Sequence, residues 1–216
     1  AMLILAYRLM ADCPKDKLAE VLHTFTETTM EICEGQQWDM DFETRMDVKV
    51  DEYVEMIRLK TSVLLAAALK IGACLADAPA QDAEKLYEFG VKMGLAFQLQ
   101  DDWLDVYGDP KVFGKNIGGD ILCNKKTFML ITALEEANEE QRAALEGWLA
   151  AREYVPAEKI AAVTALYNEI GVGKRCQEMA EALNAEGFAV LDSINLPEER
   201  KAVLKEYACS MLNRNV

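Results

Sequence analysis

Apolar residues return along most of this chain at the spacing of one helix face. They recur every three or four residues through segments 54–75, 86–97 and 160–170, a period that is typical of an amphipathic α-helix. Strict alternation, the pattern of a half-buried strand, is limited to the short stretch 47–51. The pattern therefore predicts an all-α protein, a bundle of long helices without a sheet.

The five prolines divide the chain into helical segments. Each proline is followed within a few residues by Asp, Glu or Lys, as is typical of the first turn of a helix. Together with the apolar stripes, these boundaries predict helices over 2–11, 15–35, 51–76, 81–107, 123–136, 138–152, 157–171, 174–192 and 198–212.

The charge balance narrows the possible partners. The chain has 37 acidic and 23 basic residues, a net charge of −14, so it lacks the basic surplus that nucleic acids and anionic lipids require. Small anionic substrates remain compatible if metals and lysines are gathered locally. His23 is the only histidine, which excludes most zinc sites and the usual Ser-His-Asp or Cys-His mechanisms. Any enzyme chemistry must therefore rest on carboxylates, lysines and metal ions.

The cysteines and the apolar runs indicate in which cellular compartment the protein is expected. Six cysteines are scattered without a CxxC pair, a usage typical of reduced thiols in a cytosolic protein. The longest apolar run, 63–69, is far shorter than the ~20 residues of a membrane span. We therefore expect a cytoplasmic protein with no membrane span.

The most informative stretch is 97–109, which reads FQLQDDWLDVYGD. Residues three and four apart share one face of a helix, so four polar side chains are expected to project together: Gln98, Asp101, Asp102 and Asp105. Clustered carboxylates near a helix C-terminus repel each other and oppose the macrodipole. Mg²⁺ would offset this cost, because it binds one or two carboxylates together with phosphate oxygens and water. The alternative is a solvated acidic face.

Glycines and lysines follow the acidic stretch. Segment 113–120 contains three glycines and Lys115, whose ammonium could reach a phosphate. The next predicted helix begins with Asn124-Lys125-Lys126-Thr127, and a helix N-terminus also favours anions. These residues predict a metal-bridged diphosphate site; the alternative is an ordinary helix–loop–helix connection.

These residues resemble the motifs of the trans-isoprenyl (polyprenyl) diphosphate synthases, in which FQxxDDxxD is followed by GKxxGxD and GKxT. The matching segments are 97–105, 114–120 and 124–127, preceded by a GQxxD-like segment at 35–39 and a KT pair at 60–61. Asn124 stands where the family usually has the Gly of GKxT. The resemblance covers nearly the whole chain and weakens beyond Ala137.

The resemblance implies the isoprenoid synthase type I fold, long antiparallel helices around a central cavity, as a single domain over residues 1–216. It also implies a homodimer, Mg²⁺ (or Mn²⁺) as cofactor, and allylic diphosphate and isopentenyl diphosphate as substrates. Asp101 would hold a magnesium ion on the allylic diphosphate, supported by Asp102 and Asp105.

The same resemblance implies further residue roles. Three lysines would contact the diphosphate: Lys60, Lys115 and Lys125. Thr61 and Gln98 would direct oxygen dipoles toward the allylic cation that forms when the C–O bond breaks. The expected catalytic set is Lys60, Thr61, Gln98, Asp101 and Asp102.

Two family elements are not found in this sequence: the first DDxxD motif and GGKRxRP, which grips isopentenyl diphosphate. Both would lie upstream of Ala1. We therefore expect the chain to correspond to the C-terminal two-thirds of a synthase, incomplete at its N-terminus, and to be inactive or nearly so by itself.

Three other functions compete with this interpretation. A class I terpene cyclase shares the bundle and the magnesium chemistry but lacks elements such as Lys60-Thr61 and Gly114-Lys115. A non-catalytic partner subunit of a synthase is favoured by the missing first motif. A plain helical scaffold is disfavoured by the ordered motifs.

Overall fold

The structure, a computed structural model, describes residues 1–109 and 117–212. The helices of these ranges are α1 (Met2–Ala11), α2 (Leu18–Phe42), α3 (Val50–Ile57), the π-helical segment η1 (Arg58–Ser62), α4 (Val63–Leu75), α5 (Ala80–Tyr107), α7 (Gly119–Leu122), α8 (Phe128–Glu136), α9 (Glu139–Ala150), α10 (Pro156–Ile170), α11 (Val172–Asp192) and α12 (Glu198–Leu212). No strand occurs in the described ranges. The predicted all-α bundle is therefore confirmed.

Three predicted helices differ from the structure. The helix predicted over 15–35 is α2, which runs from Leu18 to Phe42 and therefore includes the GQxxD-like segment. The predicted helix 51–76 is continuous but changes from α-helical to π-helical hydrogen bonding at η1. The predicted helix 123–136 begins only at Phe128, because Asn124 has a left-handed backbone with φ of 53° that an α-helix cannot contain. The short α7 lies before this interruption.

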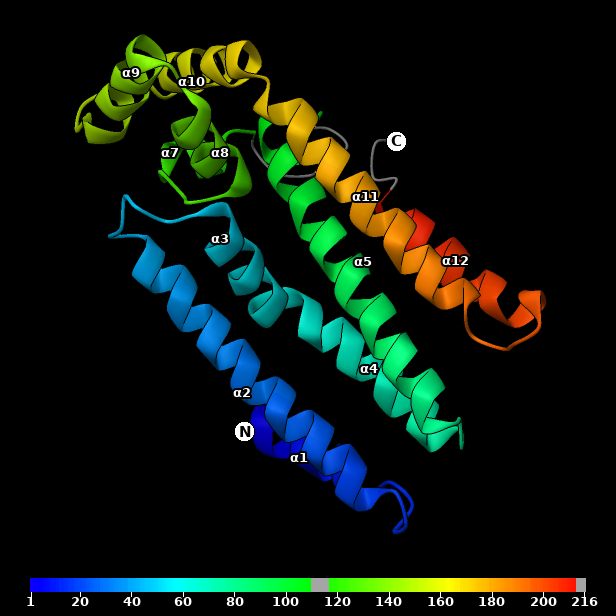
Figure 1. Cartoon of the computed structure of the whole chain (residues 1–216). Helices are drawn as coiled ribbons and strands as arrows, with labels where there is room; N and C mark the ends of the chain where they lie inside the picture. Colours follow the sequence, from blue (N-terminus) through cyan, green and yellow to red (C-terminus); the bar gives the residue numbers. More distant parts are fainter. Residues whose placement is uncertain (110–116, 213–216) are drawn as a thin grey trace.

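The long helices α2, α4 and α5 lie side by side, and α11 packs against α5 (Figure 1). Helices α7 to α10 gather at one end of this layer, and we call them the end cap. α12 packs on α5 and α11, where Phe89, Leu191 and Ile194 form a small apolar core. No helix in the described part of the chain combines the length and apolar character needed to cross a bilayer.

Two glycines allow α2 and α5 to approach η1 closely. A Cβ atom at Gly35 of α2 would lie 2.5 Å from the Lys60 backbone nitrogen, and one at Gly94 of α5 would lie 2.6 Å from the Ser62 Cα. Real side chains essentially never reach such distances. Glycine at both positions therefore lets two helices clamp the turn that carries Lys60 and Thr61.

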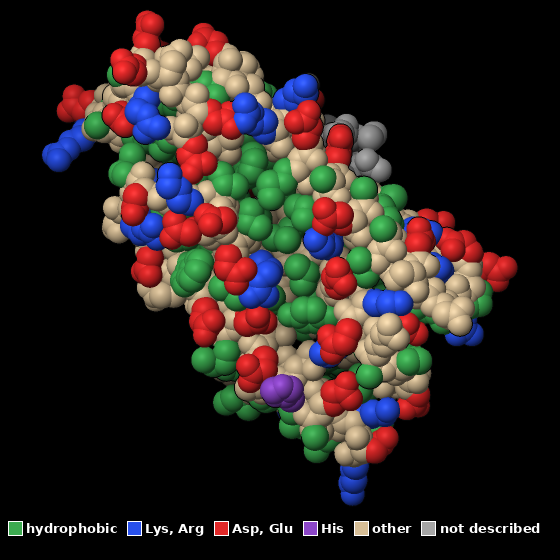
Figure 2. Space-filling view, viewed as in Figure 1, with side chains coloured by type: hydrophobic (Ala, Val, Ile, Leu, Met, Phe, Trp, Pro, Cys, Tyr) green, Lys and Arg blue, Asp and Glu red, His purple; other side chains and the backbone are tan. Residues whose placement is uncertain are grey.

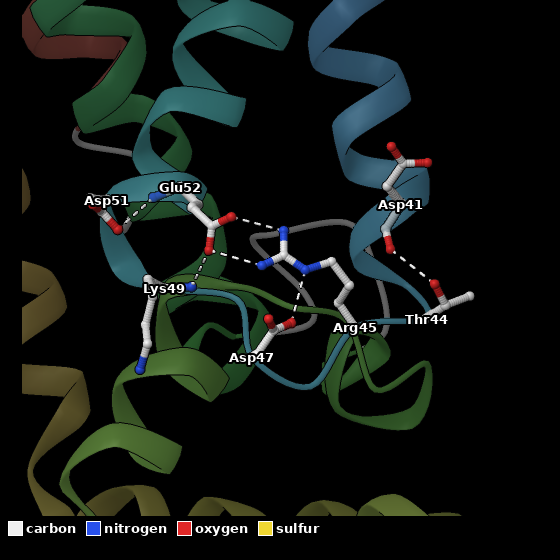
Figure 3. Close-up of polar contacts among 7 residues, drawn as sticks. All are labelled: Asp41, Thr44, Arg45, Asp47, Lys49, Asp51 and Glu52. Carbon is white, nitrogen blue, oxygen red and sulfur yellow. Dashed lines mark hydrogen bonds and ion pairs between the residues drawn. The ribbon is translucent and has the colours of Figure 1, made fainter.

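Arg45 orders the connection between α2 and α3 (Figure 3). Its guanidinium donates hydrogen bonds to Asp47 at 2.9 Å and to both carboxylate oxygens of Glu52 at 2.8 and 3.1 Å. Glu52 also accepts a hydrogen bond from the Lys49 backbone N–H at 3.0 Å. The Arg45 contacts lower the pKa of both carboxyl groups below their usual values. This network fixes how the chain turns from the end of α2 into α3.

Candidate active site

The π-helical turn η1 contains Lys60 and Thr61, the predicted KT pair. Single π-turns inside α-helices occur frequently at functional sites. Lys60 Nζ donates a hydrogen bond to Asp39 Oδ2 at 2.6 Å, and the two side chains are 32% and 19% exposed. The structure thus brings the KT pair of η1 against the aspartate of segment 35–39 on α2.

Asp102 is the centre of a buried hydrogen-bond network. Its side chain is 2% exposed and accepts hydrogen bonds from the Tyr53 hydroxyl, from Gln98 Nε2 at 3.2 Å and from the Phe128 backbone N–H at 3.4 Å. Burial raises the pKa of Asp102 to about 7, although the Tyr53 hydroxyl opposes this rise. Asp102 therefore connects α3, α5 and α8 inside the protein.

The same network orients Gln98. Its NH₂ group donates to Asp102, and its oxygen accepts a hydrogen bond from Thr61 Oγ1 at 3.5 Å. Because the amide nitrogen is used by Asp102, the carbonyl oxygen of Gln98 is directed toward Thr61 and the KT turn. The structure therefore pairs the two residues that were expected to stabilise an allylic cation.

Asp105 is half-buried beside the short helix α7. Its Oδ2 accepts a hydrogen bond from the Asp120 backbone N–H at 3.0 Å, and its backbone carbonyl accepts one from Gly118 at 2.6 Å. Burial raises the pKa of Asp105, while the N–H groups of Asp120 and Gly119 lower it, and the net direction is upward. Asp105 thus ties α5 to the start of α7.

The acidic residues of α5 do not all share one face. Asp101 and Asp105 are partly exposed and one turn apart, whereas Asp102 points into the core, because adjacent helix residues are about 100° apart. Within the described ranges no group of three or more His, Cys, Asp and Glu residues has the geometry of a metal site. Asp101 and Asp105 are thus the carboxylates of this motif that solvent can reach, whereas Asp102 is not.

Lys125 lies near several carboxylates of the site. Its Nζ lies 3.9 Å from Asp120 Oδ1. Burial lowers the pKa of Lys125, but four carboxylates more than offset this effect and raise it: those of Asp120, Asp102, Asp39 and Asp101. Lys125 is therefore held as a cation where α2, α5 and α7 meet. Lys115, the third predicted phosphate contact, lies outside the described residues.

Two cavities flank these groups. A polar cavity of about 460 Å³ lies beside the C-terminal end of α2, and its lining includes Asp39, Lys125 and Lys126. An apolar cavity of about 240 Å³ lies between α4, α5 and α12, beginning with Leu65, one turn beyond Thr61. Figure 2 shows apolar side chains running down the middle of the viewed face between charged ones.

Three residues of this region were not predicted from the sequence: Tyr53, Asn124 in its left-handed conformation, and Lys159. Tyr53 lies in the same predicted helix as Lys60, but its partner Asp102 is 49 positions later, so no local spacing indicated it. Lys159 donates to Asn124 from 35 positions later, and no local spacing signals such a contact.

Comparison with known proteins places the chain in a family. The model of the polyprenyl synthetase family matches residues 1–170. The chain belongs to this family. A short chain isoprenyl diphosphate synthase of Methanothermobacter thermautotrophicus is 36% identical over 192 residues, 88% of this chain and 55% of the relative. A (2E,6E)-farnesyl diphosphate synthase of Mycobacterium tuberculosis is 34% identical over 219 residues, 99% of this chain and 60% of the relative.

Solved structures of polyprenyl synthetases have the same fold. A crystal structure of a geranylgeranyl pyrophosphate synthase superposes with a TM-score of 0.93 at 38% identity, covering 100% of this chain and 67% of that one. A Corynebacterium glutamicum geranylgeranyl pyrophosphate synthase complexed with isoprenyl diphosphate and magnesium gives 0.89 at 29% identity, covering 98% and 60%. The chain therefore spans about 55–60% of the curated relatives cited above.

Proposed function

We propose that this protein acts in magnesium-dependent prenyl transfer, in which an allylic diphosphate is joined to isopentenyl diphosphate. The observation that carries the proposal is the meeting of separate sequence motifs at one end of the helical layer. Lys60 lies against Asp39, Thr61 against Gln98, and Lys125 faces the carboxylates of α5. The names of the relatives, farnesyl, geranylgeranyl and short chain isoprenyl diphosphate synthases, support the same chemistry.

Different residues would assist different parts of the ionisation step. Asp101 and Asp105 would hold Mg²⁺ (or Mn²⁺). When bound, this ion would neutralise charge on the leaving diphosphate. Lys60 and Lys125 contribute positive charge to the same diphosphate, with Lys115 as a further proposed contact. The oxygens of Gln98 and Thr61 would stabilise the allylic cation. Because these dipoles are already oriented, they do not have to reorganise when the cation forms.

The apolar cavity beyond Thr61 suits the hydrocarbon part of the substrate. Binding sites for small molecules are mostly apolar with a few fixed polar groups, and the lining of this cavity includes Leu65, which follows Thr61 by four residues. The allylic cation would be shielded from water there, so that the isopentenyl double bond attacks C1 and loss of a proton completes the reaction. Asp102 anchors Gln98 in this scheme and does not contact the metal.

Several wider features belong to the same proposal. We treat residues 1–216 as one domain, because the helical layer and the end cap share a continuous core.

Homodimerisation is supported by large apolar side chains of α1 that are exposed: Met2, Leu3, Ile4, Leu5 and Leu9. A cytoplasmic location is supported by six free cysteines. Light scattering coupled to size-exclusion chromatography tests the dimer.

Calorimetric titration of the 216-residue chain with inorganic pyrophosphate tests the diphosphate site. Binding is expected with Mg²⁺ present and is expected to disappear when EDTA removes the metal. The same chain incubated with both diphosphates and Mg²⁺ is expected to show little or no turnover by itself, because the first DDxxD motif is not in this sequence. Absence of pyrophosphate binding in excess Mg²⁺ would overturn the proposed function.

A partner subunit is the second candidate, because the sequence contains one DDxxD motif. A condensation assay with both diphosphates separates the candidates. Turnover by the chain alone supports the synthase. Pyrophosphate binding without turnover, together with an altered product length when the chain is added to a homologous synthase, supports the partner subunit.

A further inference from the structure

The segment that joins α7 to α8 contains a strained residue next to Lys125. Asn124 has a φ of 53°, in the left-handed region that Asn tolerates better than most residues but that glycine occupies at no steric cost. Glycine is the usual residue of the related motif at this position. The conformation of Asn124 therefore has to be stabilised by contacts that glycine could not make.

The side chain of Asn124 makes two such contacts, one to each of the outer helices of the end cap. Its Nδ2 donates to the Leu149 carbonyl, near the end of α9, at 3.1 Å. Its Oδ1 accepts a hydrogen bond from Lys159 Nζ, in the first turn of α10, at 2.6 Å. Both polar atoms of the amide are thus used to attach this segment to α9 and α10.

Lys159 is placed at a high energetic cost. It is 1% exposed, its hydrogen-bond partner is the neutral Asn124 amide, and it lies in the first turn of α10, where the helix dipole repels a cation. Its other contact is the Tyr154 ring, 4.4 Å from Nζ. Burial lowers the pKa of Lys159. The hydrogen bond to Asn124 is therefore a polar contact that offsets part of this cost.

Lys125, next to Asn124, lines one cavity together with Asp102 and Asp120. The Lys125 N–H donates to the Asp120 carbonyl at 2.9 Å, and the Lys125 carbonyl accepts from the Thr127 N–H at 2.9 Å. A change of φ at Asn124 would rotate this short segment and move the Lys125 ammonium. The position of that ammonium therefore depends on what holds Asn124.

We propose that Lys159 and Asn124 form a clamp that positions Lys125 for the diphosphate, so that α9 and α10 act on the site through this contact. The inference rests on the proposed function. Lys159 and Asn124 do not touch the diphosphate; they are positioning residues, and Lys125 is the group that binds. The clamp also gives the chain beyond Ala137, where the motif resemblance is weak, a role in the site.

A double-mutant cycle on pyrophosphate affinity tests the clamp. The Kd of pyrophosphate is measured by calorimetry in excess Mg²⁺ for the full chain, for N124G, for K159M, for K125M and for the doubles N124G/K125M and K159M/K125M. N124G and K159M are each expected to weaken binding about fivefold, a coupling typical of groups in one network. In the K125M background the same changes should have no further effect, because the clamp acts only through Lys125.

Two further variants separate positioning from general stability. N124D keeps the acceptor for Lys159 in a residue that tolerates left-handed backbone, but it loses the donor to the Leu149 carbonyl. It should therefore bind pyrophosphate more weakly than the unaltered chain and at least about twofold more tightly than N124G. Lys201 is a matched control, since it is 6% exposed and bonds helix-end carbonyls at α11, away from the site. K201M should lower the melting temperature and leave the Kd unchanged.

The outcomes are distinguishable. If the unaltered chain does not bind pyrophosphate, the proposed function and the clamp are both overturned. If it binds but N124G weakens binding by the same factor in the unaltered chain and in the K125M background, the clamp alone is overturned. A K125M variant that binds like the unaltered chain, or an N124D variant as weak as N124G, also overturns the clamp and leaves the proposed function standing.

Discussion

The helical layer of α2, α4 and α5 and the end cap of α7 to α10 supply the two sides of the candidate site in different ways. In the layer, side chains are placed by helix periodicity and by close backbone contacts at Gly35 and Gly94. In the end cap, Lys125 is placed by a non-helical segment whose conformation depends on Leu149 and Lys159. The contacts of α2 and α5 with η1 should therefore be sensitive to added volume, and the Asn124 segment to lost hydrogen bonds.

The sharpest test of this difference compares two glycines. Gly35→Ala would bring Cβ within 2.5 Å of the Lys60 backbone nitrogen, and we expect the free energy of unfolding to fall by about 3 kcal/mol because the clash is with backbone. A Cβ atom at Gly147 of α9 would meet no neighbouring atom within 4 Å. Gly147→Ala should raise stability by about 0.5 kcal/mol through lower backbone entropy in the unfolded state.

Urea unfolding followed by far-UV circular dichroism measures both variants. Equal destabilisation by the two substitutions would contradict the idea that close backbone contact with η1 excludes a side chain at Gly35.

Metal affinity gives the next largest expected effect. Asp101→Asn should weaken magnesium pyrophosphate binding on the order of 100-fold, because a ligand carboxylate is lost. Asp102→Asn, one residue further along α5, should weaken this affinity less than Asp101→Asn does, because its carboxylate is buried against Tyr53. Calorimetry at constant ionic strength measures both. Comparable losses would show that Asp102 reaches the metal after all.

The pH dependence of stability tests the buried environment of Asp102, where the layer meets the end cap. The folded-state pKa of about 7 lies above the ordinary value of 3.8, so the folded protein retains a proton that the unfolded chain releases. This contribution to stability is full below about pH 4 and is lost as the pH rises through 7. Between pH 5 and pH 7 it should fall by about 2 kcal/mol.

The control for this pH dependence is Asp102→Asn. Urea unfolding at pH 5 and at pH 7 measures both proteins. Between these pH values the free energy of unfolding of the unaltered chain should fall by about 2 kcal/mol more than that of the variant. This difference corresponds to about one proton per molecule that is released on unfolding. Matching pH profiles in the two proteins would mean that Asp102 does not retain its proton on folding.

The sequence predicted the helices and the residues of the layer because both follow from local spacing. The apolar stripes located α5, and the period of the helix placed Asp101 and Asp105 one turn apart. The same rule failed for Asp102, since a position about 100° away on the helix can meet either a cavity or the core. Only the neighbouring Tyr53 of α3 decides between the two.

The end cap was less predictable, for a physical reason. Asn124 has no helix-breaking neighbour in sequence, and the break before Phe128 depends on contacts with Leu149 and Lys159 that are far along the chain. Likewise, the ion pair of Lys60 with Asp39 joins two helices whose packing is set by Gly35. Motif spacing identified these residues but could not give their partners.

The smallest expected effect concerns Tyr53, whose hydroxyl supports Asp102 from within the layer. Tyr53→Phe should lower the free energy of unfolding by about 1 kcal/mol, because Asp102 keeps its donors Gln98 and the Phe128 N–H and loses one hydrogen bond. It should also raise the pKa of Asp102 further, since the Tyr53 hydroxyl opposes the effect of burial. NMR titration of the Asp102 carboxyl carbon measures this shift.

Tyr107→Phe is the matched control for Tyr53→Phe. Its hydroxyl donates to Asn168 Oδ1 at 2.8 Å on the exposed side of α5, where water can replace the partner, so stability should change by less than about 0.5 kcal/mol. The Asp102 pKa should not move in this variant. If removing the Tyr53 hydroxyl also left that pKa unmoved, the hydrogen bond from Tyr53 to Asp102 would not contribute to the environment of this buried carboxyl group.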